Sequence, residues 1–149
     1  MKIIILIPVY NDFQSASKLI EDINSVISNL NHEFSIIIIN DASTDKSEIE
    51  ISSTDKIKSI KIIKMNENRG HARCNASGLK YIFENEEFDY IIPMDGDGED
   101  NPIDARKLLK KANELKRMSI LFARRDVRSE PLLFRLGYFF YRILFRFCT

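Results

Sequence analysis

The chain has 149 residues, enough for one domain with a substantial core. Apolar residues make up 44% and charged residues 30%, a composition that excludes an intrinsically disordered protein. The formal net charge is zero, but residues 1–100 carry 10 Lys and Arg against 18 Asp and Glu, whereas residues 101–149 carry 12 against 4. The positive charge is therefore concentrated in the last third of the chain. No nucleic-acid partner is expected.

The chain begins with the apolar run "MKIIILIPVYND", which is short, breaks at Pro8 and lacks a small-residue cleavage site, so it predicts a β-strand rather than a signal peptide. No segment has the roughly 18 uninterrupted apolar residues of a spanning helix. Cys74 and Cys148 form no CxxC pattern, so neither a disulfide framework nor a zinc site is indicated. We expect a reducing, cytoplasmic setting.

Strands and helices are predicted to alternate along the chain. Continuous apolar runs predict buried strands, and apolar residues at intervals of three and four predict amphipathic helices. The expected strands are 3–9, 34–40, 59–65, 88–94 and 119–125, and the expected helices are 19–30, 71–85 and 101–117. This alternation predicts an α/β domain over residues 1–125, with a mostly parallel sheet between layers of helices.

The loops after the first four predicted strands are polar, and ligands of such sheets bind where these loops converge. They read "PVYND", "NDASTDKS", "NENRGHAR" and "DGDGED". The first contains no glycine, so it matches neither the GxGxxG turn of dinucleotide-binding folds nor the GxxxxGK[ST] phosphate loop. Hydride transfer and ATP hydrolysis are therefore disfavoured.

The acidic loop "MDGDGEDNP", residues 94–102, has three interpretations. Asp-Gly pairs form tight turns without any further function. A calcium loop of the EF-hand type fails, because Asp100 and Arg106 stand where that pattern requires Gly and Glu. The third interpretation is a divalent cation, held by Asp95 and Asp97, that binds a diphosphate and stabilises it as a leaving group.

Four segments together resemble the inverting glycosyltransferases of family 2, which have the GT-A fold. They are "IPVYND" at 7–12, "INDASTDKS" at 39–47, "NRGHARCNASGL" at 68–79 and "MDGDGEDNP" at 94–102. The resemblance covers residues 1–125 and implies a three-layer, Rossmann-like nucleotide-diphospho-sugar transferase fold.

The resemblance also implies roles for individual residues. Asp95 and Asp97 match the family's DxD pair and would hold Mg²⁺ or Mn²⁺, through which they would act in catalysis. Asp41 would accept hydrogen bonds from the nucleotide base, although Asp41 and Asp45 could also serve only as caps of turns or a helix. The other residues expected to line the nucleotide-sugar site are Pro8, Tyr10, Asp12, Asp45, Gly70, His71, Arg73 and Asn75.

The segment 126–149 is predicted to form an amphipathic helix. Its arginines, Arg128, Arg135, Arg142 and Arg146, are spaced by seven, seven and four residues, and most of its other residues are apolar. This pattern fits either a helix docked on protein or a helix at an anionic membrane surface. The segment resembles that of polyprenyl-phosphate and dolichyl-phosphate sugar synthases, which implies a lipid-phosphate acceptor and a peripheral position on the cytoplasmic face of the membrane.

The expected function is inverting transfer of a sugar from a UDP- or GDP-sugar to a polyprenyl phosphate or a glycan. The family continues beyond the position of Thr149 with an acceptor-side segment, so we expect a truncated enzyme with weak or no turnover in isolation. The alternative is a non-catalytic module that binds a nucleotide-sugar or associates with a membrane.

Overall fold

The computed structural model of the protein describes residues 1–45, 49, 56–115, 120–121, 137–138 and 140–141. The chain divides into two compact units, Met1–Ser119 and Ile120–Thr149. The first unit contains all of the strands and helices whose bounds are given below.

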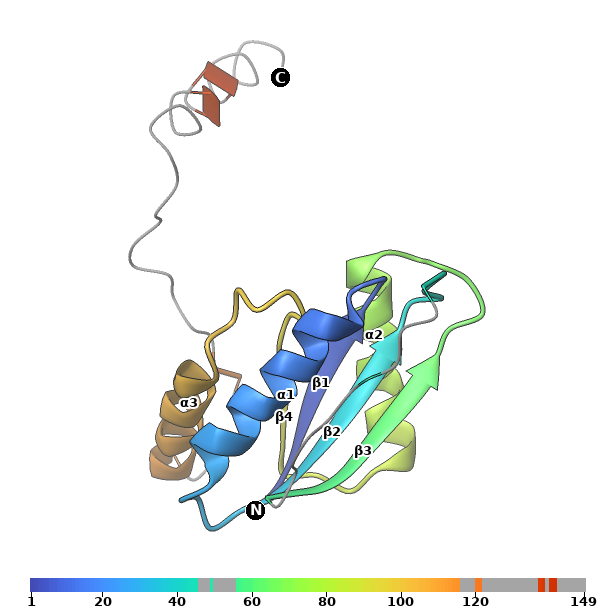
Figure 1. Cartoon of the computed structure of the whole chain (residues 1–149). Coiled ribbons are helices and arrows are strands. Elements are labelled where there is room, and N and C mark those ends of the chain that lie inside the picture. The colour runs from blue at the N-terminus through green and yellow to red at the C-terminus, as the bar shows by residue number, and fades with distance from the viewer. Residues whose placement is uncertain (46–48, 50–55, 116–119, 122–136, 139, 142–149) are drawn as a thin grey trace. The chain divides into compact units, whose positions relative to one another are not determined.

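Four described strands form a parallel sheet in the order β3-β2-β1-β4 (Figure 1). The first strand in the chain is therefore central, between β2 and β4, and Leu6 lies opposite both Ile37 and Pro93. The strands are β1 (Lys2–Val9), β2 (Glu33–Asn40), β3 (Ile57–Lys64) and β4 (Tyr90–Pro93).

The strands differ in composition because they differ in position. Every residue from Ile3 to Val9 in β1 is buried, as expected for a central strand that is covered on both faces. The sequence IKSIKIIK of β3 mixes isoleucines with lysines and a serine, and most of these residues are partly or fully exposed. Strand β3 lies at an edge of the sheet, where lysines oppose pairing with another chain.

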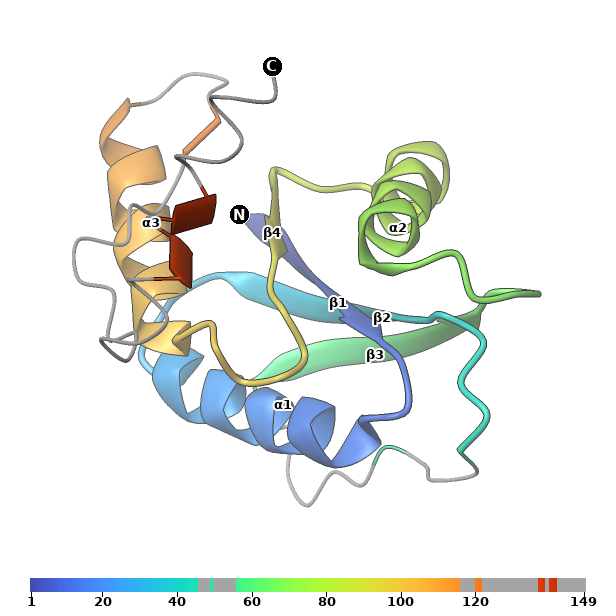
Figure 2. The ribbon, with the colours of Figure 1, turned by 90° about the horizontal axis from the view of Figure 1, so that it is seen from above.

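Helices cover both faces of the sheet (Figure 2). Helices α1 (Phe13–Ile27) and α3 (Pro102–Leu115) pack on one face, and each contributes its buried apolar residues to the core there. Helix α2 (His71–Asn85) packs on the other face against β1 and β2. The result is the three-layer arrangement expected from the sequence.

Helix α1 begins at a capping residue. The carboxylate of Asp12 accepts a hydrogen bond of 3.2 Å from the backbone N–H of Ser15, which satisfies one of the unpaired amides of the first turn. The buried residues of the helix follow intervals of three and four and form one face towards the sheet: Phe13, Ala16, Leu19, Ile20, Ile23 and Ile27.

Helix α2 approaches the sheet closely at Gly78. A Cβ atom at this position would lie 2.5 Å from Cδ1 of Leu6 and 2.8 Å from Cγ1 of Ile39. These distances are shorter than van der Waals contact, so the absence of a side chain is what allows the helix to lie this near to β1 and β2.

Most predicted elements agree with the structure. The helix predicted at 71–85 is confirmed with the same bounds, whereas the strand predicted at 88–94 is shorter and spans Tyr90–Pro93. Ile120 and Leu121, the described residues of the strand predicted at 119–125, belong to no strand. Within 126–149, residues 137–138 and 140–141 are helical, and the rest of that predicted helix lies outside the described residues.

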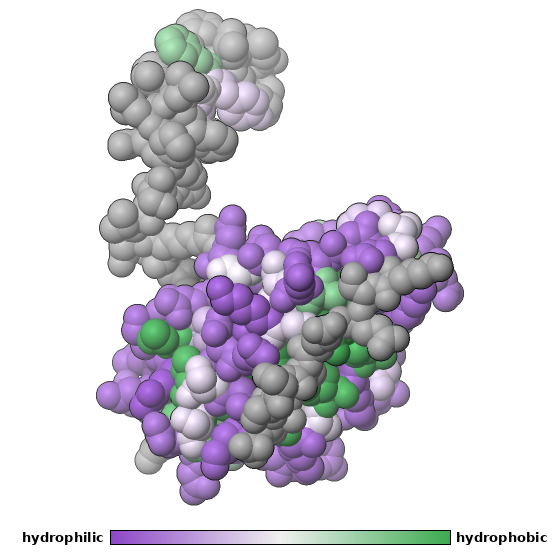
Figure 3. All heavy atoms as spheres, in the orientation of Figure 1, coloured by the Kyte–Doolittle hydropathy of each residue, from purple (hydrophilic) through white to green (hydrophobic). Residues whose placement is uncertain are grey.

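Polar side chains dominate the face of the molecule shown in Figure 3, with smaller apolar patches between them. The larger exposed apolar side chains of the first unit include Phe83 on α2 and Ile62 on β3. No helix among the residues that the structure describes is both long and apolar enough to cross a membrane.

We predict that Gly78→Val destabilises the first unit by about 2 kcal/mol or more, because the new side chain would overlap Leu6 and Ile39 in the core. The measurement is urea unfolding followed by circular dichroism. Ser77→Val is the matched control, since Ser77 is exposed on the same helix and its substitution places the same side chain in solvent. Equal losses in the two variants would contradict close packing at Gly78.

Candidate functional site

Four loops lie at the carboxyl-terminal edge of the sheet, because all four strands run parallel and end there (Figure 1). We call them loop 1 (10–12, after β1), loop 2 (41–45, after β2), loop 3 (65–70, after β3) and loop 4 (94–101, after β4). Every residue predicted to bind the nucleotide-sugar lies in these loops, in the first turns of α2, or, for Pro8, near the end of β1.

Loops 1 and 2 are joined by Asn11. Its side-chain oxygen Oδ1 accepts hydrogen bonds from the backbone N–H groups of Thr44 at 2.8 Å and Asp45 at 3.0 Å. Its own backbone N–H donates to Oγ of Ser43 at 3.0 Å. The relative position of the two loops is therefore defined by contacts of one residue.

Loops 2 and 3 are joined by Asp41, a buried residue that is only 3% exposed to solvent. Its two carboxylate oxygens accept hydrogen bonds of 2.9 Å each, Oδ1 from the backbone N–H of Arg69 and Oδ2 from that of Gly70. A buried carboxylate requires such partners, because removing an ionised group from water is costly. The predicted base-binding residue thus also holds loop 3 and the start of α2.

The thiol of Cys74 reports on this buried environment. Burial, together with the negative charge of Asp41, raises the pKa of the Cys74 thiol to about 11. The thiol Sγ lies 3.5 Å from the carbonyl oxygen of Ile39. Cys74 is therefore a buried, protonated residue at the interface of α2 with the sheet, and not a nucleophile.

Loop 4 is folded around its own carboxylates. The backbone N–H of Asp95 donates to Oδ2 of Asp100 at 2.9 Å, and the backbone N–H of Glu99 donates to Oδ1 of Asp97 at 2.9 Å. Gly98 has a φ of 82°, in the left-handed region that glycine adopts readily. The turn and the acidic cluster are therefore parts of the same loop structure, and neither interpretation of this segment excludes the other.

Loop 4 meets the start of α2 at His71. Nε2 of His71 lies 3.3 Å from Oδ1 of Asp95, and Nδ2 of Asn75 lies 2.9 Å from the same histidine nitrogen. Burial raises the pKa of the Asp95 carboxyl; His71 opposes this rise, whereas Asp100 and other acidic groups of the loop add to it. A cation near Asp95 would remove this unfavourable charge.

Gly96 places loop 4 directly against the end of β1. A Cβ atom at Gly96 would lie 3.0 Å from the carbonyl oxygen of Pro8, with Ile7 and Val9 also nearby. A side chain here would push the acidic loop away from the central strand. The absence of a side chain at Gly96 therefore lets loop 4 lie this close to the end of β1.

The donor atoms of loop 4 suit a hard divalent cation. Asp95 and Asp97 supply carboxylate oxygens, which are the ligands that Mg²⁺ and Mn²⁺ prefer. Among the described residues, however, no three His, Cys, Asp or Glu side chains are arranged to hold a metal ion by themselves. The residues fit a metal that takes its remaining ligands from water and a bound phosphate, as Mg²⁺ commonly does.

The predicted site residues differ in how they are held. Pro8 is buried in β1, Tyr10 is 48% exposed, and Asp12 is engaged in capping its own helix. Arg73 is exposed in the first turn of α2. The sequence analysis assigned no role to Asn11, Gly96 or Asp100. An Asn directly after a strand is a signal for a left-handed backbone angle, and a Gly within a loop is a signal for a close approach of the backbone.

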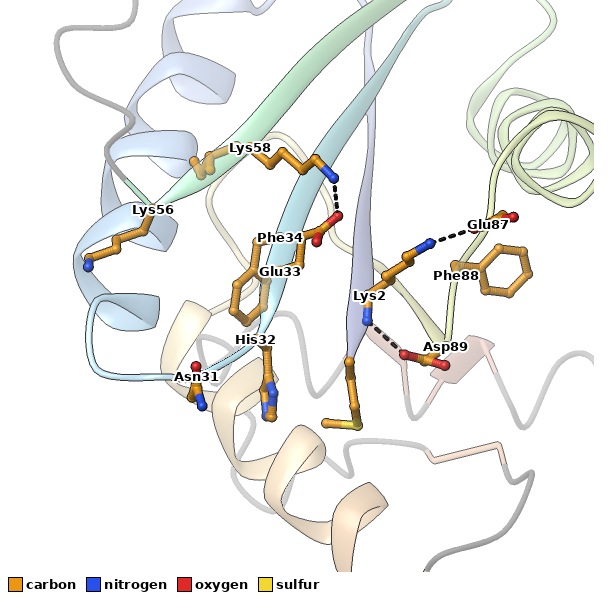
Figure 4. A pocket seen from close by; sticks show the side chains of 12 residues that line it. Lys2, Asn31, His32, Glu33, Phe34, Lys56, Lys58, Glu87, Phe88 and Asp89 are labelled. Carbon is orange, nitrogen blue, oxygen red and sulfur yellow. Dashed lines mark hydrogen bonds and ion pairs between the residues drawn. The ribbon is translucent and has the colours of Figure 1, made fainter.

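A cavity of about 760 Å³ opens at the opposite end of the strands (Figure 4). Its charged side chains form ion pairs with one another, Lys2 with Glu87 and Lys58 with Glu33. These pairs neutralise most of the charge that could attract a diphosphate. The cavity also lies far along the strands from the four loops, so it is not part of the candidate site.

Comparison with known proteins identifies a family. The profile described as glycosyl transferase family 2 matches residues 4–148. An uncharacterized protein of Methanocaldococcus jannaschii is 28% identical over 143 residues, which cover 95% of this chain and 59% of that protein. The chain thus spans about three fifths of the length of this curated relative.

Solved structures of S. aureus TarS share the fold. The match to the structure of TarS has a TM-score of 0.58 at 20% identity. It covers 89% of this chain and 23% of the TarS chain. TarS 1–349 in complex with UDP gives a TM-score of 0.55 at 20% identity, and its complex with UDP-GlcNAc gives 0.57 at 18%. Each of these complexes covers 87% of this chain, and 39% and 38% of the TarS chain respectively. The GT-A fold expected from the sequence is confirmed.

We predict that Asp41→Asn lowers the free energy of unfolding by about 1–3 kcal/mol. An amide has one acceptor oxygen instead of two, so its NH₂ group would face the N–H of Arg69 or Gly70 and leave that donor unpaired. The measurement is urea unfolding at neutral pH.

Asp12→Asn is the matched control for this change, because it makes the same substitution at an exposed helix cap. Asn and Asp are about equally good caps, so we expect a change within about 0.5 kcal/mol. If the two variants lose the same stability, the buried carboxylate does not hold loop 3 in place.

Proposed function

This chain belongs to glycosyl transferase family 2, and we propose that it forms the donor-binding domain of an inverting glycosyltransferase that uses a nucleotide-diphospho-sugar. The observation that carries the proposal is the contact between the acidic loop and the start of α2, with His71 Nε2 3.3 Å from Asp95 Oδ1. This contact brings carboxylates for a cation and the positive end of a helix to one place. A diphosphate is the group that both would bind.

The nucleoside of the donor would lie against loops 1 and 2. Tyr10 offers a half-exposed aromatic ring, a suitable surface for a nucleotide base. Each oxygen of Asp41 accepts one backbone hydrogen bond and retains a second lone pair, which can accept from an N–H of the base. The nearby Pro8, Asp12 and Asp45 would complete this part of the site.

The diphosphate would lie between loop 4 and the first turn of α2. Asp95 and Asp97 would hold Mg²⁺ or Mn²⁺, and the bound cation would neutralise the diphosphate and stabilise it as a leaving group. The free N–H groups of the first turn, beginning after Gly70, together with the cationic side chain of Arg73, would bind phosphate oxygens. Asn75 would orient His71, since the two side chains are in contact.

The acceptor that we propose is a polyprenyl phosphate, in preference to a glycan. Support comes from the C-terminal sequence, where arginines recur among aromatic residues. Among the described residues of this segment, Tyr138, Phe140 and Tyr141 are 53%, 60% and 58% exposed. Such side chains suit the boundary between lipid headgroups and acyl chains, and would keep the domain on the cytoplasmic face of a membrane.

We predict that calorimetric titration of the full chain shows binding of UDP or GDP that depends on Mn²⁺. Asp97→Asn should weaken this binding by about tenfold or more, because the cation loses one of its two carboxylate ligands. Asp104→Asn is the control, since Asp104 is an exposed residue of α3 that pairs with Lys107. The affinity of this variant for the nucleotide should equal that of the unmodified chain.

Absence of binding of both nucleotides to the unmodified chain would overturn the donor-site proposal. Binding that does not respond to Mn²⁺ or to Asp97→Asn would retain a nucleotide site but contradict the role of loop 4. Measurement of sugar release from the bound donor would then distinguish a transferase domain from a module that only binds.

For the membrane surface, we predict that the full chain cosediments with vesicles containing anionic lipid and that added salt weakens this binding. The double variant Arg135→Gln and Arg142→Gln should weaken it by roughly tenfold or more, at about 1 kcal/mol for each arginine. The double variant Lys107→Gln and Lys111→Gln, on α3, is a control of equal charge change. Equal binding to neutral vesicles would contradict the proposal.

A further inference from the structure

We propose that Asn11 is a positioning residue for the nucleoside part of the donor, acting by fixing loop 2 against loop 1. This inference rests on the proposed function, because it concerns how the same site holds its nucleotide. Asn11 is not expected to touch the donor itself. Its effect would pass through Tyr10 and Asp41, which lie on the two loops that it joins.

The backbone of Asn11 is in an unusual conformation. Its φ is 53°, in the left-handed region, where asparagine is one of the few residues with a side chain that occurs with any frequency. This conformation turns the chain between the end of β1 at Val9 and the start of α1 at Phe13. Such outliers persist where surrounding contacts hold them, and are common at functional sites.

The contacts that hold it all go to loop 2. Oδ1 of Asn11 accepts from the N–H groups of Thr44 and Asp45, and Nδ2 donates to Oγ1 of Thr44 at 3.1 Å. The backbone N–H of Asn11 donates to Oγ of Ser43, a residue that is only 8% exposed. Among the described residues, every hydrogen-bond partner of Asn11 lies in loop 2.

Asp41 holds the start of loop 2, and the contacts with Asn11 hold its later residues, Thr44 and Asp45. Ala42 is also in the left-handed region, with a φ of 55°, and this turn separates Asp41 from Ser43. The N–H of Ser43 is paired with Oδ1 of Asn40, and the next two backbone amides of loop 2 donate to Oδ1 of Asn11. Removal of the Asn11 side chain takes away both of these hydrogen bonds.

The consequence for binding is specific to one end of the donor. A shift of loop 2 changes the gap between the ring of Tyr10 and the carboxylate of Asp41, where the base is proposed to bind. Loop 4, where the diphosphate and the cation are proposed to bind, is held by His71 and by the close approach at Gly96. Loss of the Asn11 side chain should therefore weaken nucleotide binding but leave binding of a metal diphosphate intact.

Two substitutions separate the side chain from the backbone. Asn11→Gly keeps the left-handed backbone without strain and removes all side-chain contacts with loop 2. Asn11→Asp tolerates the same backbone conformation and keeps an acceptor oxygen for the amides of Thr44 and Asp45. The probes are UDP and GDP in the presence of Mn²⁺, and pyrophosphate with Mn²⁺, each titrated into the full chain.

We expect Asn11→Gly to raise the Kd of the nucleotide that binds by about tenfold, the effect of losing one to two net hydrogen bonds. The Kd of Mn²⁺-pyrophosphate should stay within about twofold, and Asn11→Asp should keep nucleotide binding within about threefold of the unmodified chain. Amide hydrogen exchange provides a measurement without ligand. The amides of Thr44 and Asp45 should exchange faster in Asn11→Gly but not in Asn11→Asp.

The outcomes distinguish this inference from the proposed function. If the unmodified chain binds neither UDP nor GDP, the proposed function fails and the positioning role fails with it. If the unmodified chain binds a nucleotide and Asn11→Gly binds it equally well, only the positioning role is overturned. Equal weakening of nucleotide and pyrophosphate in Asn11→Gly would also overturn it, because that result would indicate a general disturbance of the site.

Discussion

The buried carboxylate of Asp41 is the interaction on which the arrangement of the loops depends. An ionised group with almost no access to water is stable only if its oxygens are paired, and the backbone amides of Arg69 and Gly70 supply that pairing. The amides belong to the residues just before α2, so the start of this helix is held against the end of β2. The close packing at Gly78 then determines how near the same helix lies to the sheet.

Each of the four loops at the carboxyl-terminal edge of the sheet is joined to the next one, directly or through the first turn of α2, and the last returns to β1. Loop 1 is joined to loop 2 by the amide side chain of Asn11, and loop 2 to loop 3 by Asp41. The first turn of α2 is joined to loop 4 by His71 and Asp95. Loop 4 returns to β1 through the close approach of Gly96. Displacement of any one loop is therefore resisted by both of its neighbours, which is the rigidity that a preorganised binding site requires.

Much of the fold could be predicted from the sequence, because continuous apolar runs and helical periodicity depend on local sequence alone. The bounds of α2 were predicted correctly, since Gly70 and a polar loop precede its periodic segment. The location of the site also followed, because parallel strands place their carboxyl ends together. The hydrogen bonds within the site could not be predicted. The amide of Arg69 lies 28 residues from Asp41 in sequence, and the contacts of Asn11 depend on a left-handed backbone angle that asparagine permits but does not require.

The central position of β1 has a consequence for how the protein is made. Ile3–Val9 are synthesised before both of the strands that flank them, and β4 follows only after β2, β3 and α2. During translation this apolar segment cannot pair until strands that are distant in sequence have been synthesised. Such long-range pairing slows folding and favours aggregation. Early pairing with β2 would cover one edge of β1 and leave the other open. That edge of β1 has no strand partner until Tyr90–Pro93 has been synthesised.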